Sequence, residues 1–187
     1  ASVNSIWGTS SSDFYVVGNG GNIAHYNGSR WTKIESGTEL PFHDIYGFED
    51  NVYAIACEMF SGINSELYQI SNNNTILLER EVLGIEKLSV WKYNKKLYVA
   101  GNELFLSTEG TIGWENISET PVYHRGIYSI RGENYNSIAT AGDNFEIMYF
   151  DGVRWYKDPI EVNGNKNGDL YKVDIEDNII CAVGHYA

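Results

Sequence analysis

The chain has 187 residues, of which 14% are aromatic, and it contains 19 glycines. This length suits one domain over 1–187, and the composition favours short strands joined by tight turns. The formal net charge of −12 argues against nucleic acid and anionic membranes as partners, because phosphate binding needs clustered Lys and Arg. No apolar run approaches the roughly 20 residues of a membrane span, so membrane insertion is not expected.

A long segment of the sequence occurs twice. Ser5–Ile34 recurs as Ser129–Asp158 without a gap, at an offset of 124 (129 − 5), with nine of thirty positions identical. An offset of 124 equals three periods of about 41 residues, and two weaker copies lie between. The predicted units are 4–42, 43–84, 85–124 and 125–170, with a partial fifth at 171–187.

Each unit is predicted to contain four strands, because apolar residues alternate between turn signals. In the first unit Asn27-Gly28 predicts a type I′ hairpin. The expected strands of that unit are 5–8, 14–18, 22–26 and 30–34. Later strands are expected at 45–47, 52–57 and 66–70, then 88–91, 97–101 and 103–107, and finally 171–175 and 178–184.

A single four-stranded unit cannot bury both of its faces, so neighbouring units must stack. Radial stacking of units with a period near 41 predicts an all-β fold, a β-propeller of four-stranded antiparallel blades. A β-sandwich could hold the same number of strands, but it gives no reason for the sequence to repeat.

One repeat resembles a known pattern. Residues 6–31, IWGTSSSDFYVVGNGGNIAHYNGSRW, are similar to a bacterial β-propeller repeat of the form VWGSSxxDVFAVGxxGxIxHYDGxxW. Such repeats look related to the photosystem II assembly-factor-like and sialidase-like (BNR) propellers. The resemblance implies the propeller fold and assigns His25 to the framework; it implies little about function.

No catalytic set is recognised. The Asp-box of sialidase-like enzymes has one residue between Asp and Gly, whereas here Asn27-Gly28, Glu109-Gly110 and Asp151-Gly152 are adjacent pairs. Arg30 and Arg154 occupy equivalent repeat positions, so no arginine triad is assigned. The recurring tryptophans Trp31, Trp114 and Trp155 are interpreted as packing between blades. No catalytic residue, metal ligand or cofactor is therefore predicted.

A candidate binding surface is predicted on loops that share one face of a propeller. His43 and His124 both precede the first strand of a unit, and the loop after 52–57 is enlarged. Binding residues tend to lie on loops held by a rigid scaffold. The candidate residues are Phe42, His43, Glu58, Phe60, Tyr123, His124 and Arg125.

The function predicted from these patterns is a non-catalytic binding or scaffold propeller with a protein partner, in an exported bacterial protein (extracellular, periplasmic or at the cell surface). The alternatives are a lectin-like propeller that binds a glycan and a divergent glycoside hydrolase. A lectin would repeat the same exposed side chains in every blade, whereas the loops here differ. Cys57 and Cys181 are expected to be buried free thiols.

The fifth unit is expected to lack two strands. An uncovered apolar strand at 178–184 exposes unpaired backbone groups, which natural proteins cover. Three explanations are open: C-terminal strands of a longer parent protein, a second copy or partner that donates strands, or a tolerated short blade.

Overall fold

The computed structural model describes residues 2–80, 83–118, 126–157 and 168–186. The chain separates into two compact units, Ala1–Lys92 and Tyr93–Ala187, and each is described by itself. The sequence predicts one domain over 1–187; the boundary between the two units falls inside the third predicted blade. Among the described residues, none of the helices has the length and apolar character needed to cross a membrane.

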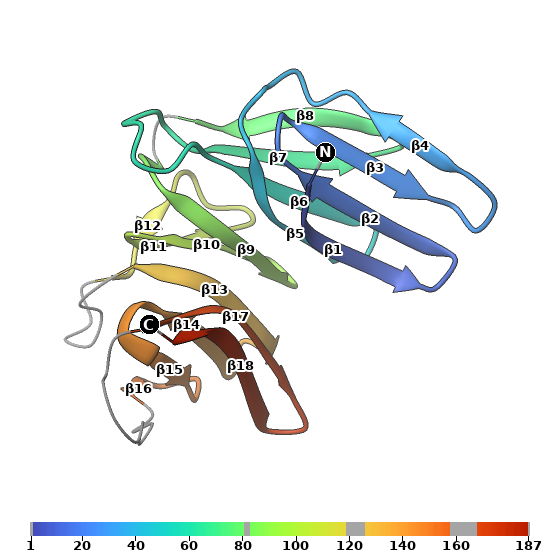
Figure 1. Ribbon diagram of the computed structural model, residues 1–187. Helices are drawn as coiled ribbons and strands as arrows, with labels where there is room; N and C mark the ends of the chain where they lie inside the picture. The colour runs from blue at the N-terminus through green and yellow to red at the C-terminus, as the bar shows by residue number, and fades with distance from the viewer. Residues whose placement is uncertain (1, 81–82, 119–125, 158–167, 187) are drawn as a thin grey trace. The chain divides into compact units, whose positions relative to one another are not determined.

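The first unit contains two complete four-stranded antiparallel sheets (Figure 1). The first sheet has the order β1-β2-β3-β4, with β1 Val3–Ser10, β2 Asp13–Gly18, β3 Asn22–Tyr26 and β4 Trp31–Ile34. The second has the order β5-β6-β7-β8, with β5 Phe42–Phe48, β6 Asn51–Ala56, β7 Glu66–Ser71 and β8 Asn74–Glu79. Strands adjacent in sequence are paired in both sheets, as the repeat predicts.

The third sheet, of order β12-β11-β10-β9, contains the boundary between the units. Its strands are β9 Lys87–Tyr93, β10 Lys96–Gly101, β11 Leu104–Thr108 and β12 Glu115–Asn116. The fourth sheet follows with β13 Ile127–Asn134, β14 Ser137–Gly142, β15 Ile147–Phe150 and β16 Trp155–Lys157, and the short helix η1 Asp143–Phe145 precedes β15. A two-stranded sheet, β17 Gly168–Glu176 and β18 Ile179–Tyr186, completes the second unit. The predicted all-β architecture of four-stranded units is confirmed.

The turn after β3 differs from the predicted type I′ hairpin. Gly28 has a positive φ of 87°, but Asn27 does not have a positive φ, and four residues separate β3 from β4. The Asn27 side-chain oxygen accepts hydrogen bonds from the backbone N–H groups of Ser29 and Arg30 at 3.2 and 3.1 Å. The side chain therefore caps the turn, and this replaces the two-residue geometry.

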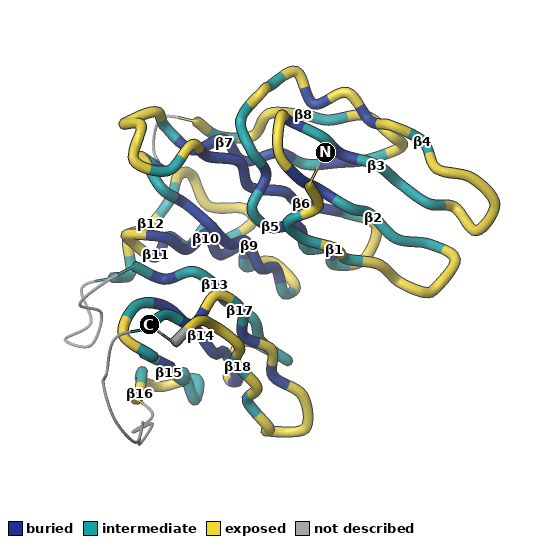
Figure 2. The backbone as a smooth tube through the Cα atoms, viewed as in Figure 1, coloured by how far each residue is buried: buried dark blue, intermediate teal, exposed yellow. Residues whose placement is uncertain are grey.

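The core of the first unit contains a buried carboxylate as well as an apolar cluster. Figure 2 shows where the buried residues lie along its strands. Asp44 on β5 is fully buried and accepts hydrogen bonds from the Ser5 and Ser89 hydroxyls at 3.0 and 2.6 Å. It also accepts one from the Val90 N–H at 3.2 Å. These three partners lie on β1 and β9, so one side chain connects the first strands of three successive repeats.

Close packing of Trp7 fixes the contact between the first two sheets. A Cβ at Gly47 would lie 2.2 Å from the indole ring of Trp7, so only glycine fits there. The Trp7 ring also lies near Tyr15 and Tyr46, with centroids 6.4 and 6.3 Å apart. Trp7 therefore packs between the first two sheets. Trp31, which was predicted to pack between blades, is instead 52% exposed and contacts Phe14 and Tyr26 of its own sheet.

The second unit packs β14, β15 and β17 around an apolar cluster that includes Ala141, Ile147, Leu170 and Val173. Between β13 and β17, the Ser129 hydroxyl accepts the Val173 N–H at 3.2 Å, as Asp44 accepts that of Val90. Both cysteines are free thiols; Cys57 is buried, but Cys181 is exposed rather than buried as expected, because β18 presents it to solvent.

Candidate binding groove

The second unit contains a groove of about 490 Å³ between the third and fourth sheets. Its lining is largely apolar. The lining residues of the third sheet lie on β10, β11, β12 and the chain just after β12, and those of the fourth sheet lie on β14, β15, β16 and the turn between β15 and β16. Figure 1 labels these strands. We call it the aromatic groove, and its apolar lining residues are Tyr98, Leu106, Ile117, Ile138, Phe150, Val153 and Trp155.

Strand register brings these side chains together. Tyr98 pairs with Leu106 across β10 and β11, and Phe150 pairs with Trp155 across β15 and β16. Directly opposite residues on antiparallel strands project to the same face, so each pair contributes two neighbouring side chains to one wall. The Phe150 and Trp155 rings are in contact, with centroids 5.1 Å apart.

The turn between β15 and β16, which is capped by the Asp151 side chain, forms one edge of the groove. The Asp151 carboxylate accepts the N–H groups of Val153 and Arg154 at 2.8 and 2.9 Å, as Asn27 does in the first repeat. The hydrogen bond from the Arg154 N–H, followed by those from the Tyr156 hydroxyl and the Val153 N–H, holds the pKa of Asp151 below its usual value. The turn leaves the Val153 side chain 86% exposed at the edge of the groove.

Arg154 is oriented by its neighbour Tyr156. The Arg154 Nε donates to the Tyr156 hydroxyl at 2.6 Å, and the guanidinium lies over the Tyr156 ring at 4.5 Å. The Tyr156 hydroxyl in turn donates to Asp151 at 2.7 Å. The two terminal nitrogens of Arg154 have no hydrogen-bond acceptor among the residues described, so they are available to a ligand.

Two further charged residues line the groove. Lys96 is half-buried, and its ammonium group has no ion-pair or hydrogen-bond partner in the described part of the chain. Glu115 is exposed on β12 and likewise makes no ion pair there. Burial raises the pKa of Tyr98 to about 12, so its hydroxyl stays neutral near pH 7. The groove therefore combines an apolar wall with two cations and one carboxylate.

The first unit has a groove at the equivalent place, of about 610 Å³, between the first and second sheets. We call it the polar groove, and its lining residues include Trp7, Asp13, Tyr15, His25, Asp50 and Asn73. The equivalence follows from register: Tyr15 pairs with His25 in the first sheet as Tyr98 pairs with Leu106 in the third. Val52 pairs with Ile70 in the second sheet as Ile138 pairs with Phe150 in the fourth.

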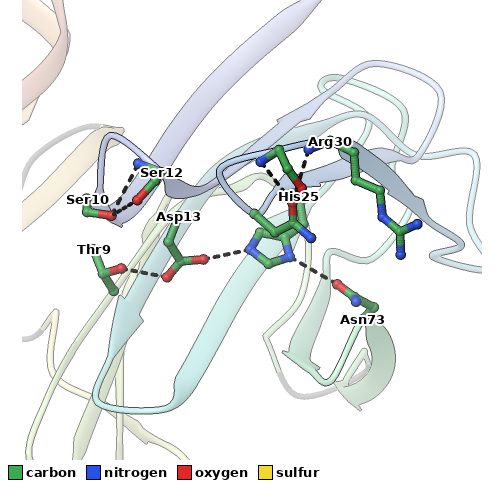
Figure 3. Close-up of polar contacts among 9 residues, drawn as sticks. Thr9, Ser10, Ser12, Asp13, His25, Arg30 and Asn73 are labelled. Carbon is green, nitrogen blue, oxygen red and sulfur yellow. Dashed lines mark hydrogen bonds and ion pairs between the residues drawn. The ribbon is translucent and has the colours of Figure 1, made fainter.

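A chain of polar contacts crosses the polar groove (Figure 3). The Thr9 hydroxyl donates to Asp13 at 2.5 Å, and the other Asp13 oxygen lies 2.7 Å from His25 Nε2. His25 Nδ1 lies 3.1 Å from the Asn73 side-chain oxygen, on the second sheet. The Thr9 hydrogen bond, followed by the one from His25, lowers the pKa of Asp13.

This chain of contacts is part of the framework. In a catalytic triad the histidine lies between the nucleophile and the acid, whereas here the carboxylate of Asp13 lies between Thr9 and His25. The second sheet has the same connection at the same register, where Gln69 donates to Asn51 at 2.5 Å. A contact that recurs with other residue types stabilises the repeat, which agrees with the framework role implied for His25.

The residues predicted as a binding surface have different positions. Phe42 is a core residue instead: it is fully buried and packs edge-on against Tyr68, so its ring cannot contact a ligand. His43 lies within β5, and not before the first strand of its unit as predicted; its Nε2 lies 3.0 Å from the Cys57 carbonyl oxygen.

Glu58 is exposed on the enlarged loop after β6 and Phe60 is 87% exposed, so these two predicted contacts lie at the surface. Tyr123, His124 and Arg125 lie outside the described residues. For the exposed positions the binding role stays a prediction.

The aromatic groove is absent from the sequence-based prediction. Trp155 and Arg154 were assigned to the repeat because they recur at Trp31 and Arg30. The informative signal is a departure from the repeat: Leu106 replaces His25, and Lys96 occupies the place of Asp13. Only the strand register shows that these two substitutions face one groove.

Comparisons with known proteins identify the fold. No protein-family model matches the sequence, and no curated protein matches it. A solved structure described as "YCF48 bound to D1 peptide" is similar, with a TM-score of 0.71 and 16% sequence identity. The match covers 98% of this chain and 62% of the other, so the chain spans about three fifths of that protein's length. Together with the four-stranded antiparallel sheets, this likeness shows that the chain has the β-propeller fold.

Proposed function

We propose that the protein is a non-catalytic β-propeller that binds an extended segment of a partner protein in the aromatic groove. The observation that carries the proposal is the pair Lys96 and Leu106, which occupy the positions where the first repeat has Asp13 and His25. A framework contact is thereby lost, and an apolar surface with unpaired cations is left in its place. Exposed apolar surfaces with a polar rim commonly mark protein interaction sites.

The dimensions and composition of the groove support this proposal. Ligand sites are concave, mostly apolar, and have volumes of roughly 300–1,000 Å³ with a few placed polar groups. The similar structure carries a bound peptide of another protein, which is a property of that protein. The same fold is therefore able to present a peptide site.

The alternatives have less support in the described residues. A glycosidase of the usual kind needs two facing carboxyl groups, and the aromatic groove has one carboxylate in its lining, Glu115. A lectin built from repeats needs equivalent sites, but the polar and aromatic grooves differ at the paired positions His25 and Leu106. One composite site fits these differences better than several equal ones.

Selection from a random displayed dodecapeptide library tests the proposal. The Val153→Asp variant places a carboxylate inside the apolar rim, and it leaves the backbone hydrogen bond to Asp151 in place. Ile112→Ser removes another highly exposed apolar side chain, one that does not line the groove, and is the matched control. Selection on the wild-type protein should enrich peptides whose binding is lost with Val153→Asp and retained with Ile112→Ser.

Two outcomes contradict the proposed function. One is a selection that enriches no peptide on correctly folded protein. The other is a set of enriched peptides that bind Val153→Asp as well as the wild type. The thermal unfolding midpoints of the three proteins should agree within about 2 °C. A loss of binding then reflects a change in the groove and not a loss of folded structure.

A further inference from the structure

We infer that the aromatic groove selects acidic segments, in which an aromatic or large aliphatic side chain is flanked by carboxylates. This inference rests on the proposed function and adds the chemistry of the partner. The observation that supports it is the charge of the groove. The lining has two cations and one carboxylate, whereas the chain as a whole is acidic.

The apolar wall accounts for the central side chain. Leu106, Phe150 and Trp155 are half-buried, and Val153 at the rim is mostly exposed. Aromatic side chains bury about 150–250 Å² each and prefer offset or edge-on contacts with other rings. A groove of about 490 Å³ has room for one such side chain together with the backbone that carries it.

The two cations account for the flanking carboxylates. Arg154 is held by Tyr156 with its terminal nitrogens unused, and Lys96 has no partner in the part of the chain that the structure describes. An arginine side chain that is held in one orientation can form two parallel hydrogen bonds with a carboxylate. It loses little further conformational entropy when it does so. A basic flanking residue would instead meet two like charges.

The rest of the molecule shows that this charge pattern is local. The chain has 25 Asp and Glu against 13 Lys and Arg. The equivalent polar groove is lined by the carboxylates Asp13, Glu49 and Asp50, with no Lys or Arg in its described lining. An acidic segment is therefore disfavoured by the net charge of the chain and by the carboxylates of the polar groove, whereas Lys96 and Arg154 attract it in the aromatic groove.

Three labelled peptides with the same Gly-Ser frame test the inference by fluorescence anisotropy at 150 mM salt. The first has Phe flanked by two Glu, the second has Phe flanked by two Lys, and the third has Gly flanked by two Glu. An exposed ion pair changes affinity by up to about fivefold. With two cations we expect the Glu-Phe peptide to bind at least about tenfold more tightly than the Lys-Phe peptide.

The charge-reversed double variant Lys96→Glu and Arg154→Glu should invert this preference. Glu115→Gln removes the carboxylate from the lining and should raise the affinity for the Glu-Phe peptide a few-fold. The Glu-Gly peptide should bind at least tenfold more weakly than the Glu-Phe peptide, because it lacks the apolar side chain.

The outcomes separate this inference from the proposed function. If both Phe peptides bind equally, or if charge reversal leaves their ratio unchanged, the inference is wrong and the proposed groove stands. If the Glu-Phe peptide does not bind at 1 mM while library peptides do, the inference is again wrong. If library selection and all three peptides fail, the proposed function fails with it.

Discussion

The polar groove of the first unit and the aromatic groove of the second share several positions of the repeat in their linings. In the polar groove Asp13 and His25 are hydrogen-bonded to each other and to groups on both sides. In the aromatic groove Lys96 and Leu106 occupy those positions, and the adjoining sheet contributes aromatic rings. The same two repeat positions therefore form a structural contact in one unit and part of a groove wall in the other.

The comparison teaches that loss of a framework contact can create a binding surface without a new loop. A buried or half-buried polar pair must be satisfied on both sides, which leaves few groups for a ligand. When the pair is replaced by an aliphatic residue and an unpaired cation, the same backbone presents apolar area and charge. The scaffold beneath both grooves stays the same because the strand pairing is unchanged.

The largest expected effect concerns the scaffold beneath the polar groove. Gly47→Ala should destabilise the protein by about 3 kcal/mol, because the added methyl group overlaps the Trp7 ring and a packed core cannot absorb it. Chemical denaturation measures the loss. The double variant Gly47→Ala and Trp7→Leu should lose clearly less than the sum of the two single changes. Additive losses would show that the Trp7 contact is not the cause.

An exchange of the paired residues tests the comparison itself. Lys96→Asp together with Leu106→His places the Asp13–His25 pair in the aromatic groove. We expect peptide binding to weaken at least about tenfold, since the apolar wall shrinks and one cation becomes an anion. The free energy of unfolding should change by no more than about 1 kcal/mol, because a new hydrogen bond offsets the lost apolar burial. Undiminished peptide binding would show that residues 96 and 106 do not contribute to the affinity of the groove.

A smaller effect is expected from Asp13→Asn in the polar groove. The pKa of Asp13 is lower in the folded protein than in the unfolded chain, so its ionised form contributes stability above the unfolded value near 4. That stability is lost as the pH falls through the lower folded value. Asp13 is partly exposed, so the loss at pH 7 should be at most about 1 kcal/mol.

Unfolding measured between pH 7 and pH 2.5 follows this contribution. The difference between Asp13→Asn and the wild type should shrink below pH 4 and vanish once Asp13 is protonated. The double variant Asp13→Asn and His25→Gln reproduces the Asn51–Gln69 pair of the second sheet and is the control. A difference that is constant over the whole pH range would contradict the assigned cause.

Much of the fold could be predicted because repetition and alternation act locally. The strand Asn22–Tyr26 was predicted with its observed bounds, since Gly20-Gly21 and Asn27-Gly28 bracket an alternating segment. The turn geometry at Asn27 was not predictable from the dipeptide, because the side chain caps the turn by hydrogen bonds to residues that follow it.

The candidate site was less predictable, since it depends on which strands face one another. From the sequence, Phe42 is predicted to lie on a loop beside His43. In the structure it begins β5 and is buried in the core. Trp155 and Arg154 were hidden by their agreement with the repeat, and the exposed Val153 is informative only once its neighbours are known. Burial and register, which decide these roles, arise from contacts distant in sequence.

The central claim is that the aromatic groove, and not its polar counterpart, receives a partner segment. Photo-crosslinking tests it most directly, with benzoylphenylalanine placed either at Val153 in the aromatic groove or at Asp50 in the polar groove. Both side chains are exposed, and Asp50 does not have a positive φ. With a library-selected peptide, mass spectrometry should find the crosslink at position 153 and none above background at position 50. Equal crosslinking at the two positions, or crosslinking at position 50 alone, would contradict the account.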